Sequence, residues 1–502
     1  MIDAIYKWAF KQRQKQIKHF IENPIEVQKE VFDGLISKAK NTEWGKKYDY
    51  NSIKNTSDFN ERIPLSTYEE FFPYINRLLK GEKDLLWPGK VSWFSKSSGT
   101  TNAKSKFIPV TTEALKDCHF KGGKDMISLY FANYNFKKVF KGKNLSIGGT
   151  HQINPENPTS RYGDVSAVIM QNLPAWAKFV KTPSTKISVM ENWDEKLEAM
   201  ATECAKVNVT SMAGVPTWTM VLIQKILEKN PGKTILDIWP NLELFMHGAV
   251  SFEPYREVFK NLIPSAEMNY QEVYNASEGF FGIQNDPSSL DMLLMLDYGV
   301  YYEFIPMGSF GNEEEHAIGL EQVELNKNYA LVISTNAGLW RYKIGDCVRF
   351  TSLSPFKIRI TGRTKHFINA FGEELVIENA DQALQFASEK TNALISNYTA
   401  APVYQNQEGK SGCHEWLIEF EKKPADMHLF NSFLDQRLKE LNSDYEAKRY
   451  NNYVLTKPLI LEVKKGGFNG WLKSKGKQGG QYKIPRLSND RIIIDEIKAF
   501  LS

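Results

Sequence analysis

Apolar residues recur at helical spacing from the first residues of the chain, and basic residues occupy the other faces. The apolar positions are Ile2, Ile5, Ala9, Ile17, Phe20 and Ile21, and the basic positions are Lys7, Lys11, Arg13, Lys15 and Lys18. This pattern predicts an amphipathic helix. Such a helix can lie on a membrane surface. A helix that packs on its own domain and exposes its basic face is the commoner arrangement, and we expect it here.

Helical patterns then alternate with short apolar strands, which is typical of α/β proteins. A strand is predicted at 90–96, before a Ser/Thr-rich loop, and another at 207–212, before a helix that starts near Pro216 and ends near Lys229. After Leu290 the pattern becomes strand-rich, with strands expected at 329–335, 339–344, 348–351 and 357–361. These strands predict a β-rich subdomain of a large amino-terminal domain.

The last part of the chain, after Gly362, mixes both patterns. A helix is predicted at 377–390 and strands at 416–421 and 459–463. We therefore expect two domains, 1–362 and 363–502, the second a small α+β domain.

Composition narrows the range of functions. The 502 residues include 63 basic and 59 acidic side chains, for a net charge of +4, which gives no reason to expect a nucleic-acid partner. The four cysteines are far apart, which fits a reducing cytosol. Charged residues interrupt the start of the chain, and no window is apolar enough for a membrane span. We expect a soluble cytoplasmic protein; the sequence does not indicate its oligomeric state.

A segment rich in hydroxyl groups follows the strand predicted at 90–96. It contains Ser97, Ser98, Gly99, Thr100, Thr101, Lys104 and Lys106. This composition is suited to binding phosphates. The short side chains provide hydroxyl hydrogen-bond donors, the glycine lets the backbone come close to an anion, and the two lysines provide positive charge. The Walker A spacing is absent, and such a segment is by itself more often a simple turn.

Two later segments add complementary chemistry. In Tyr274-Asn-Ala-Ser-Glu278, the tyrosine could stack on a base, and the carboxylate could hold Mg²⁺, which prefers oxygen ligands. In 340–346, a strand is expected to end in a Gly-Asp turn, where the carboxylate of Asp346 could accept both hydroxyls of a ribose. An Asx turn between two strands is the simpler interpretation of this second segment.

Together with a late Gln481-Tyr-Lys-Ile-Pro-Arg486, these segments resemble the acyl acid-amido synthetase family, typified by the plant enzymes that conjugate auxin and jasmonate. The family belongs to the adenylate-forming superfamily of acyl-CoA synthetases, luciferases and adenylation domains. Its motifs are SSGT[ST], YxxSE, Y[RK]xGD and QYKxPR, and they occur here in that order over nearly 400 residues. The resemblance implies an ATP- and Mg²⁺-dependent ligase. This enzyme would activate a small carboxylic acid as its acyl adenylate and transfer the acyl group to an amine or amino acid.

The resemblance also implies roles for single residues. The phosphate-binding set would be Ser97, Ser98, Gly99, Thr100, Thr101 and Lys106, the adenine-binding set His247, Gly248, Ala249 and Tyr274, and the ribose-binding set Asp346 and Arg363, and Ser277 would also contact ATP or AMP. Glu278 would hold Mg²⁺, Lys365 would lie at a hinge, and Lys483 would reach the reacting centre. His247 by itself is more often a structural histidine. Asn102 and Ala103 depart from the family, which commonly has a glycine there.

The acyl-binding pocket is the least defined part of the prediction. Met212, Val215 and Trp218 follow a predicted strand, and Trp176 and Phe179 form an aromatic cluster. Either group could contact an apolar acid, although core packing is the commoner role for such residues.

Two other functions remain open. An acyl-CoA ligase would share the first half-reaction but deliver the acyl group to a thiol; the QYKxPR motif favours the amide-forming enzyme. A nucleotide-binding regulatory module without turnover would have no chemical need for Glu278, Asp346 and Lys483 together.

Overall fold

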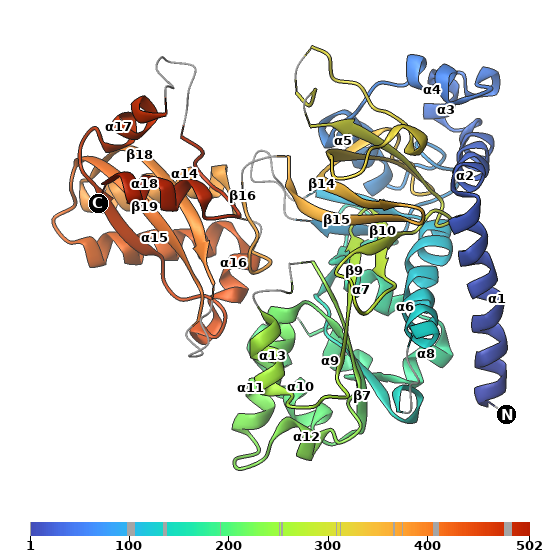
Figure 1. Ribbon diagram of the computed structural model, residues 1–502, viewed down its shortest axis with the longest axis horizontal. Coiled ribbons are helices and arrows are strands. Elements are labelled where there is room, and N and C mark those ends of the chain that lie inside the picture. Colours follow the sequence, from blue (N-terminus) through green and yellow to red (C-terminus); the bar gives the residue numbers. More distant parts are fainter. Residues whose placement is uncertain are drawn as a thin grey trace.

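The computed structural model describes residues 2–97, 106–133, 138–190, 192–249, 252, 255–307, 309–311, 313–364, 367–373, 375–404, 411–475 and 484–501. Figure 1 shows a large body, made from the amino-terminal and central parts of the chain, and a smaller carboxy-terminal lobe. The predicted fold class, an α/β protein with a large amino-terminal domain and a small α+β carboxy-terminal domain, is confirmed. The boundary between residues 362 and 363, and the movement of the small domain, stay predictions.

One sheet of eleven strands, counted within the described residues, runs through the body. In spatial order its strands are β12 (Val300–Pro306), β13 (Asn328–Thr335), β14 (Tyr342–Leu353), β15 (Phe356–Arg363), β11 (Met292–Leu294), β10 (Gly279–Gln284), β9 (Asn269–Ala276), β8 (Leu244–Gly248), β7 (Val209–Gly214), β3 (Lys143–Ser146) and β6 (Lys181–Thr182). The last five of these are mutually parallel, and the others pair antiparallel. The strand-rich stretch after Leu290 thus supplies most of the antiparallel half of this sheet.

The parallel half positions the loops that matter for function. The first four residues of β7 and of β8 are buried, as expected for parallel strands covered on both faces. Helix α11 (Pro216–Glu228) has its proline in the first turn, where no donor is lost, and it packs against α10 (Trp193–Cys204). The carboxyl ends of β3, β7 and β8 meet at one edge of the sheet, so the segments that follow them border the same space.

The segment around Gly345 differs from the prediction. Two strands separated by a Gly-Asp turn were expected, whereas Gly345 and Asp346 lie inside the single long strand β14. Gly345 has φ of 94°, and the register with β15 shifts between Cys347 and Val348. A positive φ in a glycine can produce a bulge as readily as a turn, because both need the same backbone conformation. The chain therefore kinks here and continues along the sheet.

A second sheet of the body lies beside the predicted phosphate segment. Its strand order is β2 (Lys106–Val110), β1 (Trp93–Ser97), β5 (Arg161–Gly163) and β4 (His151–Ile153). Strand β1 corresponds to the strand expected at 90–96, and Ser97 pairs with Lys106 in an antiparallel register. The residues on either side of the segment 98–105 are thus adjacent across two strands.

The remaining helices of the body surround these sheets. They are α2 (Pro24–Ala39), α3 (Glu43–Lys47), α4 (Thr56–Arg62), α5 (Tyr68–Leu79), α6 (Phe120–Asn133), α7 (Val165–Gln171), α8 (Ala175–Phe179), α9 (Thr185–Ser188), α12 (Ile235–Ile238) and α13 (Arg256–Leu262), with short 3-10 turns at η1 (Tyr50–Ser52), η3 (Val139–Lys141) and η5 (Leu320–Gln322) and a π-helical turn at η2 (Ala114–His119).

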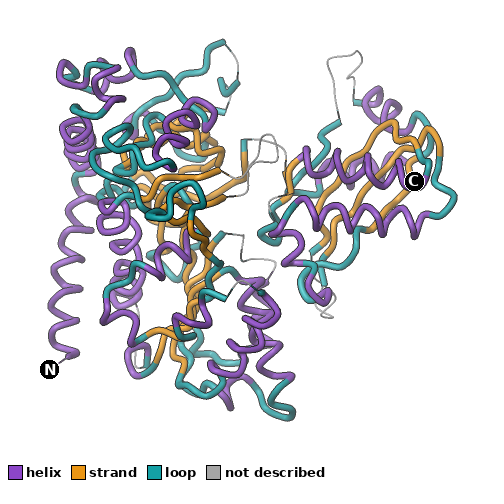
Figure 2. The backbone as a smooth tube through the Cα atoms, turned by 180° about the vertical axis from the view of Figure 1, so that it is seen from behind, coloured by secondary structure: helices purple, strands orange, loops and turns teal. Residues whose placement is uncertain are grey.

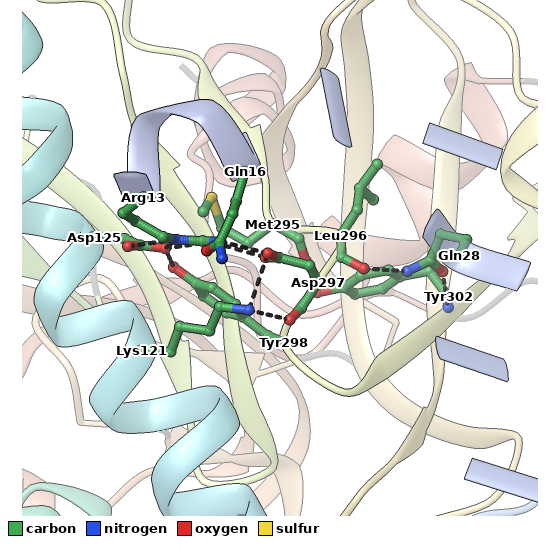
Figure 3. Close-up of polar contacts among 10 residues, drawn as sticks. All are labelled: Arg13, Gln16, Gln28, Lys121, Asp125, Met295, Leu296, Asp297, Tyr298 and Tyr302. Atoms are coloured by element: carbon green, nitrogen blue, oxygen red, sulfur yellow. Dashed lines mark hydrogen bonds and ion pairs between the residues drawn. The ribbon is translucent and has the colours of Figure 1, made fainter. Parts of the chain in front are cut away.

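Helix α1 (Ile2–Glu22) runs along the outside of the body (Figure 1). Ile17 and Phe20 are buried in the core, so the prediction of a helix that packs on its own domain holds. Arg13 was expected on a solvated basic face, but its guanidinium is largely buried and pairs with Asp125 at 2.7 Å and with Asp297 (Figure 3). Two carboxylates from distant parts of the body thus hold the helix in place. No described helix is long and apolar enough to cross a membrane.

The carboxy-terminal lobe has a sheet between two layers of helices. Its sheet contains β18 (Leu394–Val403), β19 (Cys413–Lys422) and β20 (Leu459–Val463), and its helices are α14 (Ile377–Thr391), α15 (Met427–Leu441), α16 (Ser443–Lys448), α17 (Gly467–Ser474) and α18 (Ile492–Leu501), with η6 (Tyr450–Asn452) and the short pair β16 (Phe367–Ile368) and β17 (Leu375–Val376). Figure 2 shows helices crossing the strands of this lobe. Trp416 and Ile418 pack with α14 and α15, whereas Leu417 packs with α17 and α18. This alternation follows from the two-residue period of a strand.

Candidate functional site

A large cleft lies between the body and the carboxy-terminal lobe, with a volume of about 1930 Å³. Both parts of the chain line it, because its walls include the ends of β3, β7 and β8 and also helix α16. Six of the residues singled out from the sequence line this one cleft: Ser97, Val215, Trp218, Gly248, Ala249 and Ser277. Ser97 and Ser277, which are 180 positions apart in the sequence, thus line the same cleft.

Tyr274 and Asp346 are in direct contact. The Tyr274 hydroxyl donates a hydrogen bond to the Asp346 carboxylate, and both side chains are buried. Tyr274 comes from β9 and Asp346 from the kinked part of β14. The hydrogen bond fixes the orientation of the carboxylate, because one of its oxygens is held by a donor from a rigid strand.

Lys106 is the first residue of β2, and Glu278 lies in the turn between β9 and β10. The Lys106 ammonium lies 3.5 Å from the hydroxyl of Tyr342, four residues before Asp346 on β14, and 5.6 Å from the ring centre of Tyr68. Ser277 and Glu278 form the turn between β9 and β10, directly after the strand that carries Tyr274. The carboxylate of Glu278 is of the ligand type that Mg²⁺ prefers, since this ion binds oxygen ligands and usually keeps several waters and substrate oxygens.

His247 occupies an aromatic cluster behind the cleft. Its ring stacks on Phe252, with the ring centres 3.9 Å apart, and only 2% of the residue is exposed. Burial lowers the pKa of His247 to about 3, and Arg256 acts in the same direction. The imidazole is therefore neutral and structural, whereas the backbone of Gly248 and Ala249 borders the cleft.

The predicted acyl-pocket residues do not lie together. Val215 and Trp218 line the cleft, and the Lys448 ammonium lies 4.0 Å from the ring centre of Trp218. Met212 is buried in the core, with 1% exposure, and Phe179 is at the surface, with 79% exposure. Met212 of β7 is buried in the core beneath the wall, whereas Ser211, Ala213 and Gly214 of the same strand line the cleft.

Several predicted residues lie outside the described part of the chain. They are Ser98, Gly99, Thr100, Thr101, Lys365 and Lys483, together with the side chains of Trp176 and Arg363. The main chain of Arg363 is described, and it pairs with Asp346 across β14 and β15. The roles of these residues stay predictions.

Asp164, Lys181, Lys196 and Lys448 are among the charged residues of the cleft that were not found from the sequence. Burial lowers the pKa of Lys196 to about 8, against the opposing effect of Asp164, and burial lowers the pKa of Lys181 to about 8 as well. Lysine and aspartate are common on protein surfaces, so the sequence around these four residues does not identify them as functional. The one available signal was Gly148-Gly149, directly after a strand.

Family models match most of the chain. The model of the GH3 family N-terminal domain matches residues 13–268, that of the GH3 family central domain residues 293–363, and that of the GH3 family C-terminal domain residues 378–492. The three matches follow one another along the chain, in the order N-terminal, central and C-terminal, without overlap.

Individual relatives are distant but extend over almost the whole chain. An indole-3-acetic acid-amido synthetase, GH3.4, from Arabidopsis thaliana is 25% identical, over 94% of this chain and 90% of its own. A 4-substituted benzoates-glutamate ligase, GH3.12, from the same plant is 22% identical, over 94% of each chain. The solved structure of GH3.15 acyl acid amido synthetase shares the fold, with a TM-score of 0.61 and 17% identity, over 97% of this chain and 95% of its own.

Proposed function

Because the chain belongs to the GH3 family, we propose that it is an ATP-dependent ligase that joins a carboxylic acid to an amine. It activates the acid as its acyl adenylate and then transfers the acyl group to the amine of an amino acid, forming an amide and AMP. The observation that carries this proposal is the single cleft that gathers Ser97, Gly248 and Ser277 with Val215 and Trp218. Phosphate-binding, base-binding and acid-binding chemistry have to meet in one place for this reaction.

The candidate residues divide by the part of the substrates they would contact, and Ser97, Val215, Trp218, Gly248 and Ala249 among them line the cleft. Gly248, Ala249 and Tyr274 would border the adenine, and Asp346, oriented by the Tyr274 hydroxyl, would bind the ribose with Arg363. Lys106 and the segment 97–101 would bind the phosphates, and Val215 and Trp218 would contact the acid. Glu278 would hold Mg²⁺, which supplies charge neutralisation on the phosphate oxygens.

The need for two steps follows from the chemistry of the acid. A carboxylate is a poor electrophile, because its charge is delocalised and its oxygen is a poor leaving group. The carboxylate attacks the α-phosphorus of ATP, and pyrophosphate leaves while Lys106 and Lys483 stabilise the negative charge. The carbonyl of the acyl adenylate is then open to an amine, because AMP leaves readily.

The two steps also explain why the cleft has walls from two domains. We propose that residues 363–502 form a domain that turns about a hinge near Lys365 between the steps. In one arrangement it would bring Lys483 to the phosphates, and in the other it would admit the amine while excluding water from a reactive anhydride. We include a cytoplasmic location in the proposal, since the four cysteines are free thiols.

Pyrophosphate exchange into ATP tests the first step. The purified chain is assayed with a panel of acids that begins with indole-3-acetate and 4-substituted benzoates, the acids in the names of its relatives. We expect exchange with at least one acid, and a loss of about 10²- to 10³-fold in Lys106→Met. Lys90→Met, which removes an exposed lysine charge that has no proposed role in the reaction, is the matched control and should retain full exchange.

Product analysis tests the second step. With the active acid, we expect an amide when amino acids are offered and no thioester when coenzyme A is offered. A chain that shows no exchange with any acid would contradict the proposed ligase and favour a regulatory nucleotide-binding module. A chain that forms only a thioester would instead be an acyl-CoA ligase.

A further inference from the structure

The loop after β3, residues Gly148–Thr150, is held by an unusual number of bonds to charged and polar side chains. The Lys196 ammonium donates to the carbonyls of Gly148, at 2.7 Å, and Gly149, at 3.2 Å. The Thr150 N–H donates to the Asp164 carboxylate at 3.0 Å, and the Asp164 N–H donates back to the Thr150 carbonyl at 3.1 Å. All of these residues line the cleft. The loop therefore presents Asp164 in a fixed position.

Two glycines of this loop are closely approached by side chains, Gly149 by Asp164 and Gly148 by Met170. A Cβ at position 149 would lie 1.5 Å from an oxygen of the Asp164 carboxylate, and a Cβ at position 148 would lie 1.9 Å from the end of Met170. At position 149, no other residue type fits without displacing the Asp164 carboxylate. The backbone is thus shaped around this one acidic side chain.

Asp164 lies among lysines from three other elements. It follows β5 directly, and β5 pairs with β1, which carries Lys96 at its carboxyl end. Lys196 of α10 and Lys448 of α16 also interact electrostatically with the Asp164 carboxylate. Asp164 is exposed to the cleft, and partial desolvation there raises the pKa of its carboxyl, although the Thr150 N–H and the three lysines oppose the rise.

The second step of the proposed reaction needs a proton acceptor. An amino acid reaches the cleft mainly as an ammonium ion, whose nitrogen has no lone pair with which to attack a carbonyl. A general base has to take one proton before the C–N bond can form. No residue implied by the family motifs in this chain supplies such a base, because Lys106 and Lys483 are cations and Glu278 and Asp346 would bind Mg²⁺ and ribose.

We infer that Asp164 binds the ammonium group of the acceptor and accepts its proton, with Lys196 acting as the residue that positions the loop. The inference rests on the proposed function. The freed amine attacks the acyl carbonyl, the C–N bond forms, and the C–O bond to AMP breaks with its electron pair on the phosphate oxygen. The proton that the new amide nitrogen loses leaves with the AMP phosphate. Lys96 and Lys448 favour an acceptor that also carries a carboxylate, namely an amino acid.

The variant Asp164→Asn tests this role, because the amide oxygen still accepts a hydrogen bond from Thr150 but cannot take the proton. We expect pyrophosphate exchange within about twofold of the wild-type rate and amide formation reduced about 10²-fold or more. Hydroxylamine, which is unprotonated at neutral pH, should restore product formation to near the wild-type rate. Asp117→Asn, an exposed carboxylate of the same cleft, is the matched control and should change neither step.

The pH profile separates a base from a structural residue. Raising the pH frees the amine in solution, so amide formation by Asp164→Asn should rise about tenfold per pH unit below the pKa of the acceptor. The wild-type rate should rise much less. Normal exchange with unchanged amide formation in Asp164→Asn would overturn this inference alone, and so would a joint loss of both steps. Absence of exchange in the wild-type chain would overturn the proposed function, and this inference with it.

Discussion

The guanidinium of Arg341 is buried directly before β14 and pairs with the equally buried carboxylate of Glu303. Its Nη2 lies 2.9 Å from Glu303, and its Nη1 donates to the carbonyls of Ile63, at 2.7 Å, and Asn60, at 2.9 Å. Burial raises the pKa of Glu303, and Arg341 opposes the rise. These bonds anchor the start of the strand that carries Asp346.

Replacing one partner of this pair leaves the other as an unpaired buried charge. We expect Arg341→Met to lower the free energy of unfolding by about 3–5 kcal/mol. The double variant Arg341→Met/Glu303→Leu should recover part of that loss, because it removes both charges. Urea unfolding of the three chains measures this. A double variant no more stable than the single one would show that packing of the arginine, rather than its charge, stabilises the region.

Two buried histidines should make stability depend on pH. Burial lowers the pKa of His247 to about 3 and that of His119 to about 4, while a hydrogen bond with Asn275 acts the other way on His119. Between pH 6.5 and these values the unfolded chain binds more protons, so stability falls as the pH falls. The slope is about 1.4 kcal/mol per pH unit for each histidine.

The test is the melting temperature from pH 7.5 to 4.5. His247→Phe keeps an aromatic ring against Phe252 and should have a shallower pH dependence than the wild type. His428→Gln, a change at an exposed histidine, should leave the dependence unchanged. If the melting temperature depends on pH with the same slope in all three chains, the assignment of a neutral, buried His247 is contradicted.

At the scale of elements, the bulge in β14 links backbone conformation to the site. Gly345 has φ of 94°, and its carbonyl accepts a hydrogen bond of 2.8 Å from the N–H of Thr364. A side chain at this position costs about 1–2 kcal/mol, because a left-handed conformation brings Cβ against the backbone. The kink also sets the direction of Asp346, the next residue.

Gly345→Ala should therefore reduce both stability and ATP binding. We expect a loss of about 1–2 kcal/mol in the free energy of unfolding and a several-fold rise in the KM for ATP in the exchange assay. Gly232→Ala changes a glycine with φ of 78° in open space away from the cleft, so it should reduce stability alone. The same KM in both variants would mean that the bulge does not position Asp346.

Elements with a long, regular pattern could be predicted from the sequence. Strand β20 has the predicted bounds, Leu459–Val463, and α11 starts at the predicted Pro216. The bulge at Gly345 could not be predicted, because a turn and a bulge need the same glycine conformation. The extent of the eleven-stranded sheet could not be predicted either, because the sequence of a strand does not specify which other strand pairs with it.

The candidate site divides in the same way. Motif residues such as Ser277 and Gly248 lie on the cleft because the order of strand ends is a property of the fold. Asp164 and Lys196 could not be identified from the sequence, because the loop that they contact, Gly148–Thr150, lies beside them only in the folded chain. Trp176 and Phe179 are the opposite case. They form an apolar cluster in the sequence that suggested a pocket, but Phe179 is exposed at the surface.

At the scale of the whole molecule, a few polar contacts join the lobe to the body. The Tyr453 hydroxyl donates to the Glu228 carboxylate at 2.6 Å, and the Tyr255 hydroxyl donates to the carbonyl of Ala370 at 3.0 Å. If the lobe turns between two arrangements, contacts of this kind favour the arrangement described here. Their loss should shift the balance toward the other one.

Tyr453→Phe removes the contact with Glu228 outside the cleft. A hydrogen bond to a charged group contributes about 1.5–3 kcal/mol, less when exposed, so we expect a shift of roughly threefold to tenfold in the ratio of the two arrangements. Distances between spin labels on the two domains would report it directly, and the ratio of exchange to amide formation should shift by a similar factor. Glu228→Ala, which leaves no acceptor for the Tyr453 hydroxyl, and the double variant with Tyr453→Phe should both match the single variant, because each breaks the same bond. If the double variant shifts the ratio of the two arrangements further than either single variant, the two residues act separately. If the distance distribution does not change in any variant, this contact does not govern the position of the lobe.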